Sequence, residues 1–145
     1  RRSSDLILRT IYRLVDHRVF LKQPYTATEV PFTHISLQEL FGEHSILNAV
    51  CGNAEALKKV AIGFAGEEFI HDEEDCLDGL CELINSINGM FASKMSSEDM
   101  DLDMKVPQYH LNAGTLKADS LLCIPVVVFD QELTFVLSLD TPYSI

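Results

Sequence analysis

The sequence has no apolar segment long enough to span a membrane. No apolar run approaches the roughly 20 residues that a membrane-spanning helix needs. The N-terminus also lacks the apolar core and the cleavage site of a signal peptide. We therefore expect a cytoplasmic protein that does not insert into a membrane. The chain begins with Arg1-Arg2-Ser3-Ser4 and has no initiator methionine, which suggests a piece excised from a longer protein.

Cysteine pairs with the spacing of a metal site are absent as well. The four cysteines lie in apolar or helical contexts without C-x-x-C spacing: Cys51, Cys76, Cys81 and Cys123. We expect reduced packing residues rather than disulfides or a zinc site. His, Asp and Glu do occur side by side from His71 to Asp75. Consecutive residues of one helical turn point in different directions and cannot close on one ion, so we expect no metal on this chain and read the run as an acidic helix start.

Basic residues are scarce. The chain has 11 Lys and Arg against 22 Asp and Glu, a net charge of -11, which disfavours any partner with a phosphate backbone and predicts no nucleic-acid binding. Six of the basic residues lie in the first 22 positions, whereas residues 67–103 hold twelve acids and Lys94 alone. A partner that docks on this acidic stretch should therefore offer positive charge.

The length and composition suit one globular unit. The chain has 145 residues, of which 47% are apolar, and we expect a single domain over residues 1–145. Within it we expect an N-terminal helix in residues 1–20, capped by Ser4 or Asp5 and ending near His17, and a core over residues 33–140.

Apolar periodicity and turn residues predict the elements of this core. They are, in order, two strands, two helices and three strands: His34–Phe41, Ser45–Cys51, Ala54–Ala65, Asp75–Met95, Leu102–Tyr109, Leu121–Phe129 and Leu133–Leu139. With the N-terminal helix, this order predicts an α+β fold in which two paired helices pack on one face of a mostly antiparallel sheet. Pro125 cannot donate to a strand ladder, so it implies an edge, a bulge or a strand that pairs beyond its own chain.

The helix over Asp75–Met95 carries two polar residues outside its buried stripe. Glu82 and Asn85 lie one turn apart and within about 60° of each other, so both can address the same point outside the helix. Their neighbours Ser86 and Gly89 are small. A mid-helix glycine costs about 1 kcal/mol relative to alanine, and a thin surface that admits a partner's backbone would explain it. Taken alone, an exposed Glu and Asn are also ordinary solvating residues.

A longer pattern includes this pair. The pattern has an aspartate, three residues, a glutamate, two residues, an asparagine, then twenty-one residues and a proline; these are Asp78, Glu82, Asn85 and Pro107. It resembles the signature of the CheC/CheX/FliY family of chemotaxis phosphatases. The stretch Asn85–Gly89 is similar to the N-x-I-x-G continuation of the family's helix.

The resemblance covers about residues 33–140 and extends to the helix before the signature, where Ala54–Glu68 is similar to the family's preceding helix. The sequence has no second E-x-x-N followed by a distant proline. One such helix per chain is the CheX type, whereas CheC usually carries two.

The resemblance implies hydrolysis of the aspartyl phosphate on a response-regulator receiver domain such as CheY. The receiver supplies Mg²⁺ and a lysine, so this chain needs no cofactor of its own. In the family's scheme Asn85 orients the attacking water through its amide, and Glu82 pairs with the receiver's lysine. The remaining marked positions are docking residues and one structural residue: Asp78, Ser86 and Gly89 for docking, and Pro107 for the shape of the strand after the site.

The resemblance also implies a homodimer, because sheets of the CheX type pair between subunits. A different class of function remains open. The same helix face could serve a non-catalytic interaction module that binds a receiver domain, a flagellar switch component or a second copy of the chain, and excision from a longer protein slightly favours that reading. No residue argues for a small-molecule sensor.

Overall fold

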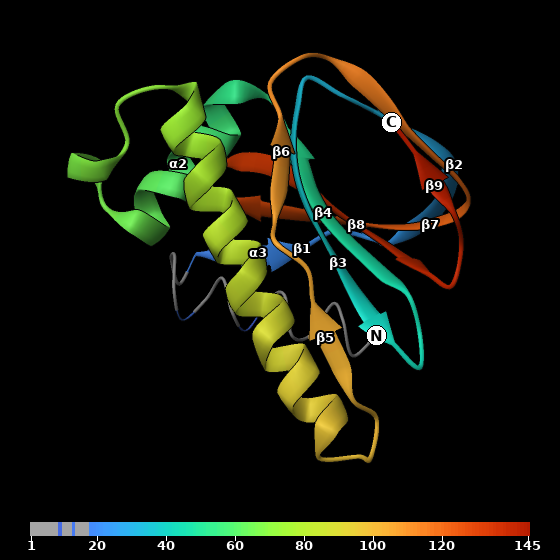
Figure 1. The fold of residues 1–145 in the computed structure, drawn as a ribbon. Helices are drawn as coiled ribbons and strands as arrows, with labels where there is room; N and C mark the ends of the chain where they lie inside the picture. The colour runs from blue at the N-terminus through green and yellow to red at the C-terminus, as the bar shows by residue number, and fades with distance from the viewer. Residues whose placement is uncertain (1–8, 10–12, 14–17) are drawn as a thin grey trace.

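The computed structural model describes residues 9, 13 and 18–145. Two helices, α2 (Ala54–Ala65) and α3 (Glu73–Ser96), lie together on one side of a large curved sheet (Figure 1). A short 3-10 helix, η1 (Glu67–Phe69), connects them. This arrangement confirms the predicted α+β fold with two paired helices against an antiparallel sheet.

One nine-stranded sheet forms within the described residues. Its main path runs β1-β7-β8-β4-β3-β5, while β2 and β9 also pair with β7, and β6 pairs with β3. Every pairing is antiparallel. The strands are β1 (Val19–Leu21), β2 (Tyr25–Phe32), β3 (His34–Gly42), β4 (Ile46–Gly52), β5 (Leu102–Met104), β6 (Gln108–His110), β7 (Gly114–Val128), β8 (Gln131–Leu139) and β9 (Tyr143–Ser144).

The structure contains more strand than the sequence pattern predicts. The strands β1 and β2 occupy the end of the segment expected as a helix over residues 1–20 and the connection after it, and β9 closes the C-terminus. The predicted strand Leu102–Tyr109 is divided into β5 and β6, and β7 begins at Gly114 rather than at Leu121. The helix expected to end near His17 lies outside the described residues, apart from Arg9 and Arg13.

The curvature of the sheet creates two apolar cores. The first lies between the helices and the sheet and includes Leu80, Ile84 and Phe135. The second lies on the opposite face, where β2 and the first half of β7 curl back over β3 and β4 (Figure 1), and it includes Leu37 and Cys123. The strand β7 contributes side chains to both cores, so its apolar segment is buried on both faces.

Local capping signals fix the ends of the two helices. The Asn53 side chain accepts a 2.7 Å hydrogen bond from the Ala56 amide, and Gly66 ends α2 with a φ of 101°, a backbone conformation that favours glycine. Asp72 caps α3 in the same way by accepting from the amide of Asp75 at 2.7 Å. The acidic residues of the His71–Asp75 run therefore lie at the positive end of the helix dipole.

Pro125 lies in the middle of β7, opposite Thr134 of β8. Its carbonyl accepts a 3.0 Å hydrogen bond from the amide of Lys22, on the side of β7 away from β8. In a strand, the N–H and C=O of one residue point to the same side, so the missing N–H of Pro125 faces the break between β1 and β2. The sheet therefore tolerates this proline within a single chain.

All four cysteines are free and buried, which confirms the predicted packing role. Burial raises the pKa of Cys51 to about 12 and that of Cys76 to about 11. Among the described residues, no group of three or more His, Cys, Asp or Glu side chains is placed to hold a metal ion. No helix in the same part of the chain is long and apolar enough to cross a membrane.

Candidate functional site

The helix α3 presents the predicted polar pair to solvent. Its apolar stripe is buried against α2 and β3, whereas Asp78, Glu82 and Asn85 are exposed. Within the part of the chain that the structure describes, the carboxylates of Asp78 and Glu82 have no hydrogen-bond or ion-pair partner. Both carboxylates are therefore available to a partner molecule.

The side chain of Asn85 is hydrogen-bonded to a residue of the sheet. Its Oδ1 accepts a 2.7 Å hydrogen bond from Nε2 of Gln38, a β3 residue that is only 1% exposed. Its Nδ2 has no hydrogen-bond partner among the described residues. Gln38 was not among the site residues expected from the sequence. The available signal was a pair of polar residues two positions apart, Ser36 and Gln38, which share one face of the strand and alternate with the apolar residues Ile35 and Leu37.

Two further buried amides continue from Gln38 into the interior. Nδ2 of Asn88 donates to Oε1 of Gln38 at 2.8 Å, and Nδ2 of Asn48 donates to Oδ1 of Asn88 at 3.0 Å. Asn48 and Asn88 are each 2% exposed. Together with Asn85, these residues form an amide row: Asn85, Gln38, Asn88 and Asn48.

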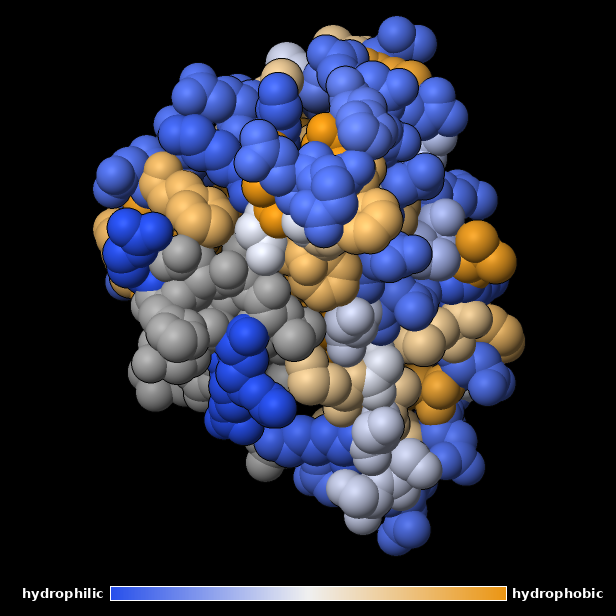
Figure 2. All heavy atoms as spheres, turned by 90° about the vertical axis from the view of Figure 1, so that its left-hand side faces the viewer, coloured by the Kyte–Doolittle hydropathy of each residue, from blue (hydrophilic) through white to orange (hydrophobic). Residues whose placement is uncertain are grey.

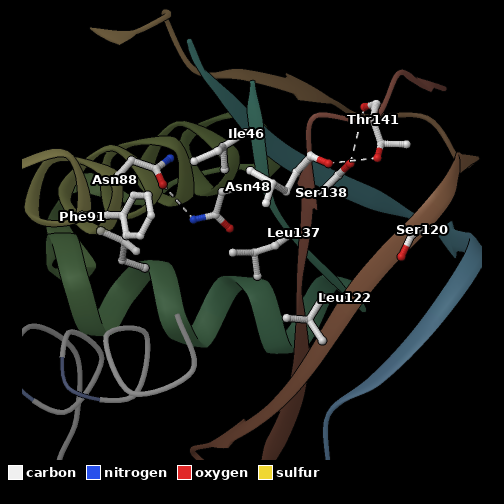
Figure 3. Close-up of a pocket in the computed structure, with 11 residues that line it drawn as sticks. Ile46, Asn48, Asn88, Phe91, Ser120, Leu122, Leu137, Ser138 and Thr141 are labelled. Carbon is white, nitrogen blue, oxygen red and sulfur yellow. Dashed lines mark hydrogen bonds between the residues drawn. The ribbon is translucent and has the colours of Figure 1, made fainter. Parts of the chain in front are cut away.

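The amide row ends in a pocket of about 330 Å³ between α3 and the sheet. Figure 3 shows Asn48 and Asn88 joined at one side of it, and Leu122 and Leu137 are among the apolar residues that line it. Oδ1 of Asn48 is buried and has no hydrogen-bond partner in the described structure. The row therefore connects the interior of the domain with the exposed amide of Asn85.

The residues of α3 next to Glu82 and Asn85 have small side chains that project little from the helix. Ser86 is partly buried, and its hydroxyl donates to the backbone carbonyl of Glu82 at 3.0 Å, so it does not project from the helix. Gly89 continues this surface one turn beyond Asn85. A partner's backbone can approach α3 closely at these two positions.

Pro107 lies in the interruption between β5 and β6. The pairing of β3 with these strands leaves three residues, Lys105 to Pro107, opposite two residues, Gln38 and Glu39. This extra residue makes a bulge, where a residue without an N–H removes no ladder bond. The Lys105 carbonyl in the bulge accepts a second hydrogen bond from Nε2 of Gln38, at 2.8 Å.

Negative charge surrounds the N-terminal half of α3. Residues 67–82 contain eight acidic residues, all exposed except Asp75: Glu67, Glu68, Asp72, Glu73, Glu74, Asp75, Asp78 and Glu82. Figure 2 shows the helical side of the molecule, and hydrophilic residues cover most of the upper part of this face. A partner that approaches this end of α3 meets a surface suited to positive charge.

Comparison with known proteins identifies the family. The family model described as "Chemotaxis phosphatase CheX" matches residues 34–130, well over half of the chain. The chain therefore belongs to the CheX family. The matched range contains β3, α2, α3 with the exposed pair, and Pro107. No match was found among curated proteins.

Solved structures share the fold. A CheX from Desulfovibrio desulfuricans superposes with a TM-score of 0.78 at 16% identity, covering 94% of this chain and 95% of that chain. A chain of the CheX-CheY-BeF3-Mg²⁺ complex from Borrelia burgdorferi gives a TM-score of 0.75 at 16% identity, covering 94% of each chain. FliY from Thermotoga maritima gives 0.58 at 12% identity, covering 92% and 83%. At these identities the similarity establishes the fold alone.

Proposed function

We propose that this protein hydrolyses the aspartyl phosphate of a response-regulator receiver domain, using Asn85 and Glu82. The observation that carries the proposal is the joint exposure of these two side chains on one rigid helix, with the Asn85 amide tethered to Gln38. Membership of the CheX family supports the reaction, and the Borrelia complex supports a receiver domain as the partner.

An acyl phosphate needs little help from a second protein, because the mixed anhydride is already activated. The receiver holds the phosphoaspartate together with Mg²⁺ and a lysine, which neutralise the phosphoryl charge. A water oxygen bonds to phosphorus as the bond to the aspartyl oxygen breaks. The products are the free aspartate, inorganic phosphate and one proton released to solvent. This chain therefore has to position the attacking water, and it does not need to supply a nucleophile or a metal of its own.

An amide at position 85 suits the task of holding this water. It can donate and accept hydrogen bonds, and it carries no charge that would repel the phosphoryl group. Two N–H donors and the second lone pair of Oδ1 remain for the water and the substrate once Gln38 has donated to Oδ1. A carboxylate at the same position would face the phosphoryl oxygens with like charge.

Glu82 would set the register of docking. Its exposed carboxylate has no partner among the described residues, and an ion pair with the receiver's lysine would be buried by the contact. Asp78, Ser86 and Gly89 would form the docking surface around it. The proposal also includes a homodimer in the cytoplasm whose sheets pair between subunits. Light scattering on the purified chain tests whether it is a dimer.

The proposal is tested with phosphorylated receiver, Mg²⁺ and the purified protein. The wild type should speed dephosphorylation, whereas Asn85→Ala and Glu82→Ala should be slow. Asp119→Asn removes an exposed carboxylate from β7, outside α3, and should behave as wild type. A wild type no faster than the receiver's own decay, with several receivers tried, contradicts the enzymatic function.

The same variants distinguish a phosphatase from a non-catalytic interaction module. A phosphatase should lose turnover in Asn85→Ala and still bind the receiver. A module that only binds would retain its affinity in this variant and would show no wild-type rate to lose.

A further inference from the structure

The orientation of each amide in the amide row is determined by one backbone carbonyl. The two ends of an amide group have nearly the same shape, so its orientation follows from its hydrogen-bond partners. The backbone carbonyl of Lys105 can only accept, and it lies 2.8 Å from the Gln38 side chain. The Gln38 atom that faces it must therefore be Nε2.

The fixed orientation of the Gln38 amide in turn fixes the amides of Asn85 and Asn88. The second proton of Nε2 points to Asn85 at 2.7 Å, so Asn85 has to present its oxygen there. Oε1 of Gln38 requires a donor, which Nδ2 of Asn88 provides at 2.8 Å. Turning Gln38 over would bring its oxygen against the carbonyl of Lys105, and it would break all three hydrogen bonds.

We propose that Gln38 is a positioning residue that fixes the Asn85 amide with its NH2 group directed away from the sheet. The terminal torsion of an exposed asparagine is otherwise broad, and both orientations are accessible. With Gln38 in place, one orientation is present before the partner arrives. The catalytic part of this inference rests on the proposed function, whereas the orientation of the amide does not.

The burial of the row supports this role. Gln38, Asn48 and Asn88 are each at most 2% exposed, at positions where apolar side chains would pack without needing hydrogen bonds. A buried amide network holds its members in one arrangement when its bonds are made. Gln38 is the member of the row that contacts Asn85, so the fixed orientation of Gln38 is passed directly to that side chain.

The sharpest variant is Gln38→Glu, which keeps the shape of the side chain and replaces its donors with acceptors. The new carboxylate would accept from Nδ2 of Asn85, so the Asn85 amide should turn over and direct Oδ1 outward. Asn48→Leu is the matched control. It alters the same buried row at its far end but leaves the contact between Gln38 and the Lys105 carbonyl intact.

Side-chain amide NMR measures the orientation without any substrate. In the wild type, both Nε2 protons of Gln38 should exchange slowly with solvent, and the Nδ2 protons of Asn85 should exchange fast. In Gln38→Glu, one Asn85 Nδ2 proton should become protected, whereas Asn48→Leu should leave it fast. Asn85→Ala assigns the signals. If Gln38→Glu does not fold, the exchange rates of the Gln38 and Asn85 amide protons in the wild type decide the orientation of the Asn85 amide on their own.

Turnover measures the consequence. Gln38→Glu should lower kcat for phosphorylated receiver about tenfold or more, because a misplaced catalytic group loses rate. KM, and affinity for BeF3-bound receiver, should change less than about twofold, whereas damage to the fold would change both. Asn48→Leu should retain kcat.

The two hypotheses fail in different ways. A wild type that dephosphorylates no receiver overturns the proposed function, and the exchange measurements still decide the orientation of Asn85. Slow exchange of Asn85 Nδ2 in the wild type overturns the positioning role, and so does a wild-type kcat in folded Gln38→Glu.

Discussion

Outside its own helix, the nearest atom that a Cβ added at Gly89 would meet is Cε of Met104, 4.0 Å away. The packing of the monomer therefore does not require a glycine here. Gly89→Ala should stabilise the free protein by about 1 kcal/mol, because it restores helix propensity at a half-buried mid-helix position that has room for a methyl group. The same methyl group should weaken receiver binding by occupying the space that a partner's backbone enters.

Chemical denaturation and titration with BeF3-bound receiver measure these two opposed effects. Gly79→Ala is the control, because Gly79 lies in the contact between α3 and α2, where an added Cβ would come 3.4 Å from Cβ of Ala61. Its effect should be on stability and not on receiver binding. Unchanged affinity in Gly89→Ala would remove Gly89 from the docking surface.

Asn85→Asp should abolish most dephosphorylation while the protein stays folded. The substitution keeps the shape of the side chain but replaces the NH2 donors with a charged oxygen that faces the phosphoryl group. We expect a loss of about 100-fold in kcat, measured by single-turnover decay of labelled receiver. Asn112→Asp adds the same charge in an exposed loop and should retain the wild-type rate. An active Asn85→Asp would show that the amide does not position the water.

Glu82→Gln should act mainly on affinity. Loss of the ion pair with the receiver's lysine should weaken binding about tenfold and reduce its dependence on salt. Titrations of BeF3-bound receiver at low and high ionic strength measure both quantities. Asp119→Asn supplies the control for a change of one unit in net charge. Equal salt dependence in wild type and Glu82→Gln would argue against this pairing.

The buried thiols should make the protein less stable at alkaline pH. Burial, followed by the nearby Cys123, raises the pKa of Cys51 from 9.0 to about 12. Between these values the thiol ionises in the unfolded chain but not in the folded one, so the stability present below pH 9.0 is lost as the pH rises toward about 12. The free energy of unfolding in urea should therefore fall more steeply above pH 9 in the wild type than in Cys51→Ala. Rapid alkylation of Cys51 in the native protein at pH 8 would contradict its burial.

Signals within a few residues predicted the helices well. Asn53 and Gly66 cap α2 because their effects depend on neighbouring backbone groups alone. The helical period likewise separated the buried stripe of α3 from the face that bears Glu82 and Asn85. The spacing of residues within one long helix determines which of them share a face, so this part of the site could be predicted from the sequence.

Long-range pairing explains what the sequence could not predict. The strand β2 is mostly exposed and contains Pro31, and it becomes a strand because β7 offers it an edge. The break that accommodates Pro125 exists only when β1 and β2 are both in place. Gln38 lies 47 positions before Asn85, and no local pattern joins them.

The carboxylate of Glu82 and the amide of Asn85 both lie on the outer surface of α3. Under the proposed function, an enclosed active site therefore forms only while a receiver domain covers them. Acetyl phosphate and other low-mass acyl phosphates bring no such enclosure. Under the proposed function, the metabolic pool of these compounds should therefore be spared, while the same chemical linkage should be hydrolysed when a folded receiver domain presents it.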